Sequence, residues 1–216
     1  MAAKSEPQSE PKTAHGNFFE DFSEGQVLRH ATPRTVTEGD RALYTALTGA
    51  RFALHSSDEF ARGLGLPGAP LDDLLVFHVV FGKTVPEVSL NAVANLGYAS
   101  CVFGAPVYPG DTLSTTSRVI GLKENSNRKT GVVYVHSTGV NQRGETVLDY
   151  IRWVMVNKRD PEAPAPAPVV PDLAKAVALP ERKAPAQAAE TEGRRRRRRG
   201  AKGGDSRSDA ETVTAE

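Results

Sequence analysis

The chain has 216 residues, and its composition separates a region able to bury a core from two ends that are not. The eight Phe, five Tyr and single Trp all lie at or before Trp153, whereas residues 161–216 have no aromatic residue and seven of the fifteen prolines. A stretch with so little apolar surface does not offset the roughly 1–2 kcal/mol per residue lost when backbone is ordered. We therefore predict one domain over residues 17–160, with disordered ends at residues 1–16 and 161–216.

Charge and cysteine content exclude several classes of protein. Residues 1–160 carry 16 Lys and Arg against 17 Asp and Glu, so the predicted domain lacks the basic surface of a nucleic-acid-binding body. The single cysteine, Cys101, allows no intramolecular disulfide and no cysteine-rich zinc site. The N-terminus is polar, and no run of about 18 apolar residues occurs. These features predict a cytoplasmic protein with no membrane segment.

Six consecutive arginines, Arg194 to Arg199, follow a Pro/Ala-rich spacer in the C-terminal segment. Adjacent cations of this kind bind phosphate backbones or other anionic surfaces through counterion release. Acidic residues on both sides of the run, among them Glu192 and Asp205, weaken its field. The run is interpreted either as a solvated tail without function or as a tether to an anionic partner.

Two capped helices are predicted in the first half of the domain. Residues 26–36 alternate loosely between apolar and polar and predict a first strand. Thr37 and Asp40 have the spacing of a capping box, so we expect a helix after Thr37 that ends at Gly49 in a left-handed cap. A second short helix is expected over residues 57–64, because a serine opens this stretch and a glycine follows it.

The most apolar stretch, residues 70–86, predicts a long helix buried on every side, because its apolar residues cover nearly the whole helical wheel. Turn sequences rich in Gly, Pro and Asn separate four strands expected after it, over residues 91–103, 111–122, 131–140 and 145–156. Consecutive antiparallel strands after one buried helix indicate an α+β fold in which a curved sheet wraps the helix. No glycine-rich phosphate loop follows a strand, so a nucleotide-binding fold is not expected.

The order and motifs of these segments resemble the MaoC-like hydratases of the hot-dog fold. The likeness extends over residues 17–172 and is strongest in TVTEGDRALYTALTG, APLDDLLVFHVVFGKTV, PVYPGDTL, KTGVVYVHSTGVNQRGE and VLDYIRWVMVNKRDP. Within the family, the chain is most similar to the amino-terminal half of two-unit members that interconvert a short branched enoyl-CoA thioester, such as mesaconyl-CoA, and its hydrated form, β-methylmalyl-CoA. The resemblance implies a single hot-dog domain and an acyl-CoA hydratase or dehydratase, a hydro-lyase, or a subunit of one.

The resemblance also implies a pair of acid/base residues, an Asp and a His, in a motif of the form Gly-Asp-x-Asn-Pro-x-His. Gly49 and His55 match its glycine and histidine. The Asp, Asn and Pro positions are instead Ala50, Phe52 and Ala53. His55 is therefore the candidate catalytic residue, without its expected partner, and the alternative is a polar loop residue bonded to backbone.

Four further residues are candidates for substrate binding. Asp72 and Asp73 open the central helix, where they either favour its positive end or lie beside the thioester, whose carbonyl oxygen the helix N–H groups would bind. Asn95 and Tyr98, on the next strand, are candidates for lining an acyl pocket. Alternation alone does not show which of the two faces inward.

Several charged residues have competing interpretations. The candidates for binding coenzyme A phosphates, unless they are ordinary surface cations, are Arg51, Arg152, Lys158 and Arg159. His78, inside the apolar helix, is expected to be a hydrogen-bonded core histidine. Asp40 and Asp58 lie near His55 in the sequence, but they are interpreted as a helix cap and a first-turn residue.

Two functions of different class stay open. The chain is either an acyl-CoA hydratase or a subunit of one, or a non-catalytic acyl-CoA-binding or scaffold hot-dog protein with a degenerate site. A lone hot-dog unit leaves a sheet edge unpaired, so we expect a homodimer or a heterodimer with a second hot-dog subunit. The resemblance implies no metal and no cofactor, with the coenzyme A thioester as the substrate.

Overall fold

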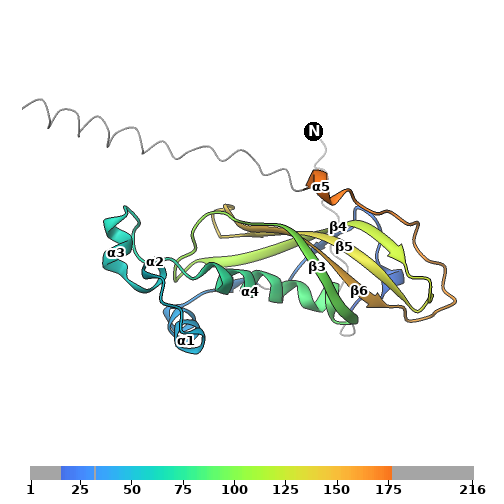
Figure 1. Ribbon diagram of the computed structural model, residues 1–216, viewed down its shortest axis with the longest axis horizontal. Helices are drawn as coiled ribbons and strands as arrows, with labels where there is room; N and C mark the ends of the chain where they lie inside the picture. The colour runs from blue at the N-terminus through green and yellow to red at the C-terminus, as the bar shows by residue number, and fades with distance from the viewer. Residues whose placement is uncertain (1–15, 32, 177–216) are drawn as a thin grey trace, which may run out of the picture. The chain divides into compact units, whose positions relative to one another are not determined.

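The computed structural model describes residues 16–31 and 33–176, which form an antiparallel sheet with a long helix on one face (Figure 1). Four long strands make up most of the sheet: β3 (Ala92–Phe103), β4 (Thr112–Glu124), β5 (Thr130–Val140) and β6 (Thr146–Asn157). Their bounds lie close to the predicted ones, and the predicted α+β hot-dog architecture is confirmed. The Arg194–Arg199 run lies outside the described residues.

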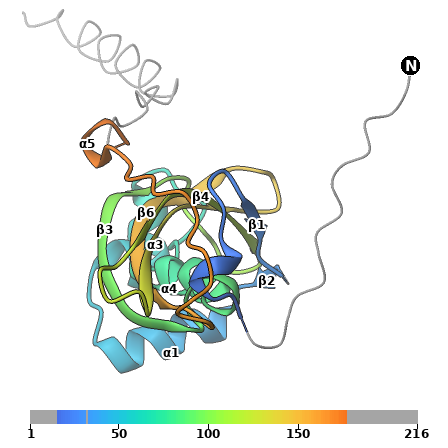
Figure 2. The same ribbon diagram turned by 90° about the vertical axis from the view of Figure 1, so that its right-hand side faces the viewer.

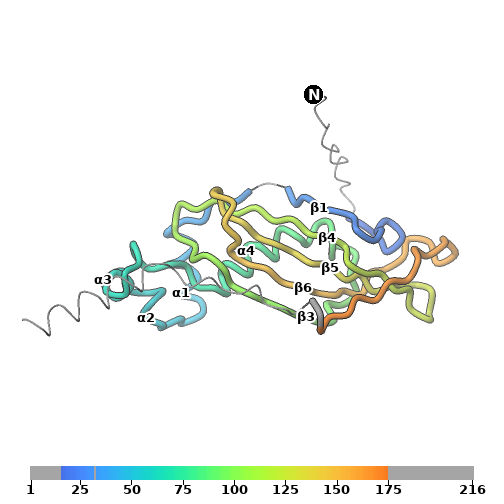
Figure 3. The backbone as a smooth tube through the Cα atoms, turned by 90° about the horizontal axis from the view of Figure 1, so that it is seen from above, coloured from blue at the N-terminus to red at the C-terminus, as the bar shows by residue number. Residues whose placement is uncertain are grey.

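The strands follow the order β1-β4-β5-β6-β3, and each neighbouring pair is antiparallel (Figure 3). Two short strands, β1 (Val27–Arg29) and β2 (Arg34–Thr35), both pair with β4. The prediction of one continuous strand over residues 26–36 is wrong, because Pro33 has no N–H to contribute to a ladder. At the opposite side of the sheet, β3 pairs only with β6 among the described residues, so its outer edge is open.

The region before the central helix contains three short helices, α1 (Glu38–Thr48), α2 (Ala53–Ser56) and α3 (Asp58–Gly63). The predicted capping box of α1 is confirmed, because Thr37 Oγ1 accepts from the Asp40 N–H at 3.2 Å and Asp40 Oδ2 accepts from the Thr37 N–H at 2.9 Å. Gly49 ends α1 with φ 65°, the left-handed conformation that favours glycine. Helix α3 is the predicted second helix, whereas the single turn of α2 was not predicted.

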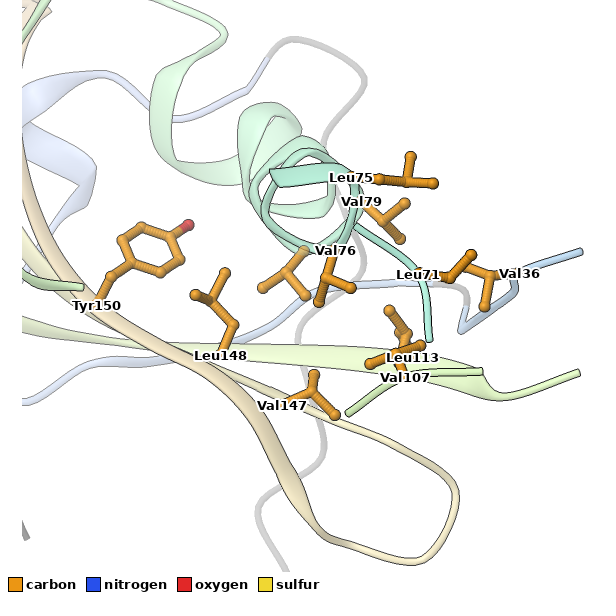
Figure 4. Packing of buried hydrophobic residues seen from close by; sticks show 11 residues of the cluster. Val36, Leu71, Leu75, Val76, Val79, Val107, Leu113, Val147, Leu148 and Tyr150 are labelled. Carbon is orange, nitrogen blue, oxygen red and sulfur yellow. The ribbon is translucent and has the colours of Figure 1, made fainter. Parts of the chain in front are cut away.

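The central helix α4 (Asp73–Thr84) continues into one wider turn, η2 (Val85–Ser89), and the sheet curves around it (Figure 2). Figure 4 shows α4 side chains such as Val76 packing toward Leu113 and Leu148 of the strands. The prediction of burial on every side is wrong, because Leu74 is 56% exposed and His78 is also exposed. Sheet covers only one side of the helix, so part of its apolar surface stays open.

Residues 161–169 contact the domain beside the end of β4. Val169 and Leu122 exchange two backbone hydrogen bonds, each of 2.7 Å. The buried ammonium of Lys158 donates to Glu124 Oε1 at 2.8 Å and to the carbonyl oxygens of Pro161 and Ala163 at 3.0 and 2.8 Å. These contacts attach residues 161–169 to the domain. The disorder expected over residues 161–216 stays a prediction.

Candidate active site

The predicted catalytic segment lies between α1 and the start of α4. His55, on α2, is half-buried, and its Nδ1 lies 3.2 Å from the Pro70 carbonyl oxygen. Because a carbonyl oxygen only accepts, Nδ1 carries the proton in the neutral ring, and the lone pair is on Nε2. Nε2 has no hydrogen-bond partner among the described residues, so His55 presents a free basic nitrogen here.

The side chains around His55 are those of α1, α2 and the start of α4. They line a small cavity: Arg41, Tyr44, Thr45, Ala50, His55, Ser56, Asp72 and Leu75. Ala50, the position at which the resemblance places an Asp, lies in this wall and contributes only a methyl group. The structure thus brings His55 and Asp72 to one cavity, in which position 50 supplies no acid.

The two carboxylates at the start of α4 differ in environment. Asp72 is the N-cap, and its Oδ1 accepts from the Leu74 N–H at 2.9 Å. Loss of hydration raises the pKa of the Asp73 carboxyl, His55 lowers it, and the neighbouring Asp72 raises it further. The pKa of the Asp73 carboxyl is thus raised, and His55 is close enough to act on it electrostatically.

Two other carboxylates near His55 in the sequence are occupied by structural contacts. Asp40 holds the α1 cap and an ion pair with Arg34, and its hydrogen bonds with Thr37 hold its pKa below the usual value despite partial desolvation. Asp58 accepts from the Ala69 N–H at 2.9 Å, which lowers its pKa, and Arg41 adds to this effect. Neither carboxylate replaces the missing acid beside His55.

The remaining predicted binding residues lie apart from His55. Tyr98, on β3, has its ring 5.8 Å from Phe77 and 6.3 Å from Tyr150. Asn95 Nδ2 donates to the Tyr98 hydroxyl at 2.5 Å. These two residues belong to the open β3 edge, whereas Arg51 is exposed in the segment between α1 and α2.

Three of the four cations predicted to bind phosphate instead make contacts within the domain. Arg159 forms an ion pair with Asp21 at 2.7 Å. Lys158 is buried, and its ammonium donates to Glu124 at the end of β4. Arg152 is completely buried between β6 and α4, so the interpretation of Arg152 as a surface cation is wrong. The strand register causes this, because residue 152 falls on the helix-facing side of β6.

His78 is also placed differently from the prediction. It is exposed rather than in the core, and its ring lies 6.1 Å from the ring of Tyr44. Together with residues of α4, η2 and the β1–β2 region, it lines a cavity of about 390 Å³: Ala31, Arg34, His78, Val79, Gly82, Lys83, Pro86 and Glu87. The helix turns this histidine away from the sheet.

A buried polar network, which was not predicted, adjoins that cavity through Glu87. His30 Nδ1 lies 2.8 Å from Glu87 Oε2, and His30 Nε2 lies 2.7 Å from Ser117 Oγ. Ser117 Oγ is in turn 2.7 Å from Ser137 Oγ. These four residues are too far apart in the chain for a sequence motif to predict the network. The network links β4 and β5 to η2 by hydrogen bonds.

A second histidine and carboxylate pair lies on the other face of the sheet. His136 Nε2 is 2.7 Å from Asp149 Oδ1, and Thr138 Oγ1 donates to Asp149 Oδ2 at 2.8 Å. The hydrogen bond with Asp149 raises the pKa of His136, while burial and Arg118 lower it. Burial raises the pKa of Asp149, but the His136 and Thr138 bonds outweigh it and hold this pKa below the usual value.

This pair gives a pH-dependent contribution to stability. The raised pKa of His136 means that its contribution is full below about pH 6.5 and is lost as pH rises through the folded-state value. The lowered pKa of Asp149 means that its contribution is present above about pH 4 and is lost at lower pH. We expect Asp149→Asn to lower the free energy of unfolding by about 0.5–1 kcal/mol at pH 5.5.

Urea unfolding at pH 5.5 and pH 9 checks this expectation. The loss caused by Asp149→Asn is expected to shrink at pH 9, where His136 is neutral. Thr138→Val is the matched control, because it removes an uncharged donor to the same carboxylate. Its loss is expected to be equal at the two pH values. If Asp149→Asn lowered the free energy of unfolding by the same amount at both pH values, the proposed charge pairing of His136 with Asp149 would be contradicted.

Neither a metal cluster nor a membrane span is found in the described part of the chain. In residues 16–31 and 33–176, no three His, Cys, Asp or Glu side chains gather closely enough to hold a metal ion. None of the helices described is long and apolar enough to span a membrane.

The small cavity beside His55 lies at the N-terminal end of α4, the helix around which the sheet curves. Residues 21–141 match the MaoC like domain. The chain belongs to the MaoC-like family. It is 73% identical to the β-methylmalyl-CoA dehydratase of Chloroflexus aurantiacus over 75% of this chain and 46% of that protein. It is 65% identical to the mesaconyl-CoA hydratase of Cereibacter sphaeroides over 77% of this chain and 49% of that protein.

A solved structure shows that this MaoC-like chain has the hot-dog fold. A Mycobacterium tuberculosis protein with a double hot-dog fold superposes with a TM-score of 0.68 at 30% identity, over 81% of this chain and 53% of that one. The MaoC-like chain thus spans about half the length of the curated relatives it matches. It likewise covers about half of the double hot-dog protein.

Proposed function

We propose that the chain is one hot-dog unit of an acyl-CoA hydratase, a hydro-lyase that acts on a short branched enoyl-CoA such as mesaconyl-CoA and forms β-methylmalyl-CoA. The observation that carries this proposal is the 73% identity to a β-methylmalyl-CoA dehydratase over 162 residues. Hydration moves a proton and a hydroxide but no electrons, so the coenzyme A thioester is the substrate and no further cofactor takes part. The site of action that we propose is the cytoplasm.

Hydration of an enoyl thioester requires more acid/base groups than this chain places beside His55. Adding water to an enoyl thioester needs a base for the water, an acid for the α-carbon and donors for the enolate oxygen. The N–H groups at the start of α4 lie at the His55 cavity, with Asp72 and Asp73 beside them. Ala50 supplies no carboxyl next to His55. We therefore assign the complete acid/base pair to a second hot-dog unit.

The surface of this chain suits such a unit. Large apolar side chains are exposed along α1 to α3, on α4 and on the open edge at β3: Leu43, Leu47, Phe52, Phe60, Leu64, Leu74, Leu90, Val93, Leu96 and Tyr98. Monomeric proteins rarely expose so many apolar side chains together, and an open strand edge favours pairing. A second hot-dog unit, as a second copy or a separate subunit, would cover both features.

Two other arrangements have an observation in their favour. The free Nε2 of His55 and the raised pKa of Asp73 favour an enzyme that uses these two groups of its own, with Arg51, Asn95 and Tyr98 as substrate contacts. The replacement of the expected Asp and Asn by Ala50 and Phe52 favours a non-catalytic acyl-CoA-binding protein. An anionic partner for the Arg194–Arg199 run stays a separate proposal.

Light scattering tests the second unit directly. The full chain is measured alone and mixed with the separately purified carboxy-terminal half of the Chloroflexus relative. We expect a dimer of the chain alone, and in the mixture a one-to-one complex. As a control, Leu96→Lys puts a charge on the open β3 edge and is expected to weaken both associations. A chain that stays monomeric in both samples would contradict the proposal.

A further inference from the structure

Arg152 is a buried charged side chain between α4 and the sheet that the chemistry above does not use. It lies on β6 with no exposed surface, and its Nη2 donates to Thr84 Oγ1 at 2.8 Å and to Ser89 Oγ at 3.4 Å. Its guanidinium carbon lies 4.4 Å from the centre of the Phe81 ring. Nε and Nη1, which are buried, have no hydrogen-bond partner among the described residues.

The charge of this side chain is therefore only partly compensated. A guanidinium has five N–H donors, of which the three on Nε and Nη1 find no acceptor in residues 16–31 and 33–176. No carboxylate in the described part of the chain forms an ion pair with it, and burial lowers the pKa of Arg152. Burying an unpaired cation is strongly unfavourable, because its attraction to water is lost without replacement. Such a group suits an anion that arrives from outside.

The surroundings of Arg152 define the anion. Aromatic rings form the side of the site that faces the β3 edge: Phe77, Phe81, Tyr98 and Tyr150. Tyr98 stands directly across from Arg152 in the β3–β6 pair and is 43% exposed, so it is the residue that separates the guanidinium from the open edge. One cation among aromatic rings matches a small group with a single charge and a flat apolar body. A coenzyme A phosphate is bulkier, more highly charged and strongly hydrated.

We propose that Arg152 binds the free carboxylate of a dicarboxylic acyl group, with Tyr98 turning aside to admit it. The inference rests on the proposed function, because it names the acyl class that this unit selects. Mesaconyl-CoA carries such a carboxylate at the end of its four-carbon acyl chain. The carboxylate accepts from the N–H groups of Nε or Nη1 and supplies the missing counter-charge.

The position of Arg152 also separates it from His55. Arg152 contacts Thr84 at the C-terminal end of α4, whereas His55 lies at the N-terminal end, and the helix between them spans roughly 16 Å. A four-carbon acyl chain extends only about 5 Å from its thioester carbon to its carboxylate oxygens. His55 therefore does not reach an acyl group that Arg152 holds. The groups that move its protons, and the donors to its enolate oxygen, belong to the second hot-dog unit.

Calorimetric titration tests the inference with two thioesters that differ only at the carboxylate. Mesaconyl-CoA and 2-methylbut-2-enoyl-CoA, in which a methyl group replaces the carboxylate, are titrated into the full chain, alone and together with the second unit. We expect mesaconyl-CoA to bind about 10- to 100-fold more tightly, the range for a buried hydrogen bond to a charged group. Arg152→Gln is expected to remove this preference while the affinity for the methyl analogue stays the same.

Two further measurements separate binding from structure. Arg152→Lys keeps the charge and is expected to retain part of the preference. Arg152→Met removes the unpaired charge and is expected to leave the melting temperature unchanged or raise it, whereas a structural arginine would lower it. Equal binding of both thioesters by the unmodified chain overturns this inference and leaves the proposed function standing. Failure to bind either thioester overturns the proposed function and the inference with it.

Discussion

Hydration of mesaconyl-CoA is expected to be about 100- to 10,000-fold slower with the chain alone than with the chain and a second hot-dog unit together. This is the factor that a positioned acid/base residue contributes, and Ala50 has no side chain able to exchange a proton. The rate is followed by the loss of enoyl-thioester absorbance, with the carboxy-terminal half of the Chloroflexus relative as the second unit. That half alone is the baseline.

His55→Ala decides which unit holds the catalytic pair. The rate of the mixture is expected to change by less than about twofold, because His55 and Arg152 lie at opposite ends of α4. Leu54→Ala is the matched control, since it shortens a neighbouring side chain of the same short helix and leaves the basic nitrogen in place. A loss of about 100-fold with His55→Ala alone would instead assign the chemistry to His55 and Asp73. A full rate from the unmodified chain by itself would remove the need for a second unit.

Local signals in the sequence predicted the elements well. The Thr37 and Asp40 spacing, with Gly49 after it, placed α1 because capping depends on groups within one turn of helix. Turns at Gly110 and Gly144 placed the strands, since both glycines have positive φ. Gly110 comes just before β4, and Gly144 lies in the hairpin turn between β5 and β6. The prediction of one continuous first strand gave too little weight to a local signal, a proline inside the segment.

The site was less predictable because it depends on distant parts of the chain. Alternation along β6 shows which side of the sheet residue 152 lies on. Only the packing of α4 shows that this side is buried. The apolar wheel of α4 predicted burial on every side, yet hydrophobicity does not say whether the covering surface belongs to the same chain. Leu74 is apolar and exposed because nothing in the described residues packs on that side. The open helix face is thus a surface that the proposed second unit would cover.

The contact between α4 and the sheet depends on a glycine in β5. A Cβ atom at Gly139 would lie 2.6 and 2.8 Å from the two γ-carbons of Val80, which is completely buried on α4. We expect Gly139→Ala to push the helix and the sheet apart, since the added Cβ overlaps a fully buried valine. Overpacking of this kind is expected to lower the free energy of unfolding by about 1–3 kcal/mol. Urea unfolding of the full chain measures it.

Gly82→Ala provides the matched control on the same helix. Nothing lies within 4 Å of a Cβ built at Gly82, on the exposed side of α4, so the added methyl group meets no neighbour. Alanine is favoured over glycine inside a helix, and the free energy of unfolding is expected to rise by up to about 1 kcal/mol. The two substitutions add the same methyl group and are expected to change stability in opposite directions, because only one of them lies between helix and sheet. A loss of similar size at both positions would mean that α4 does not pack on β5 through Val80.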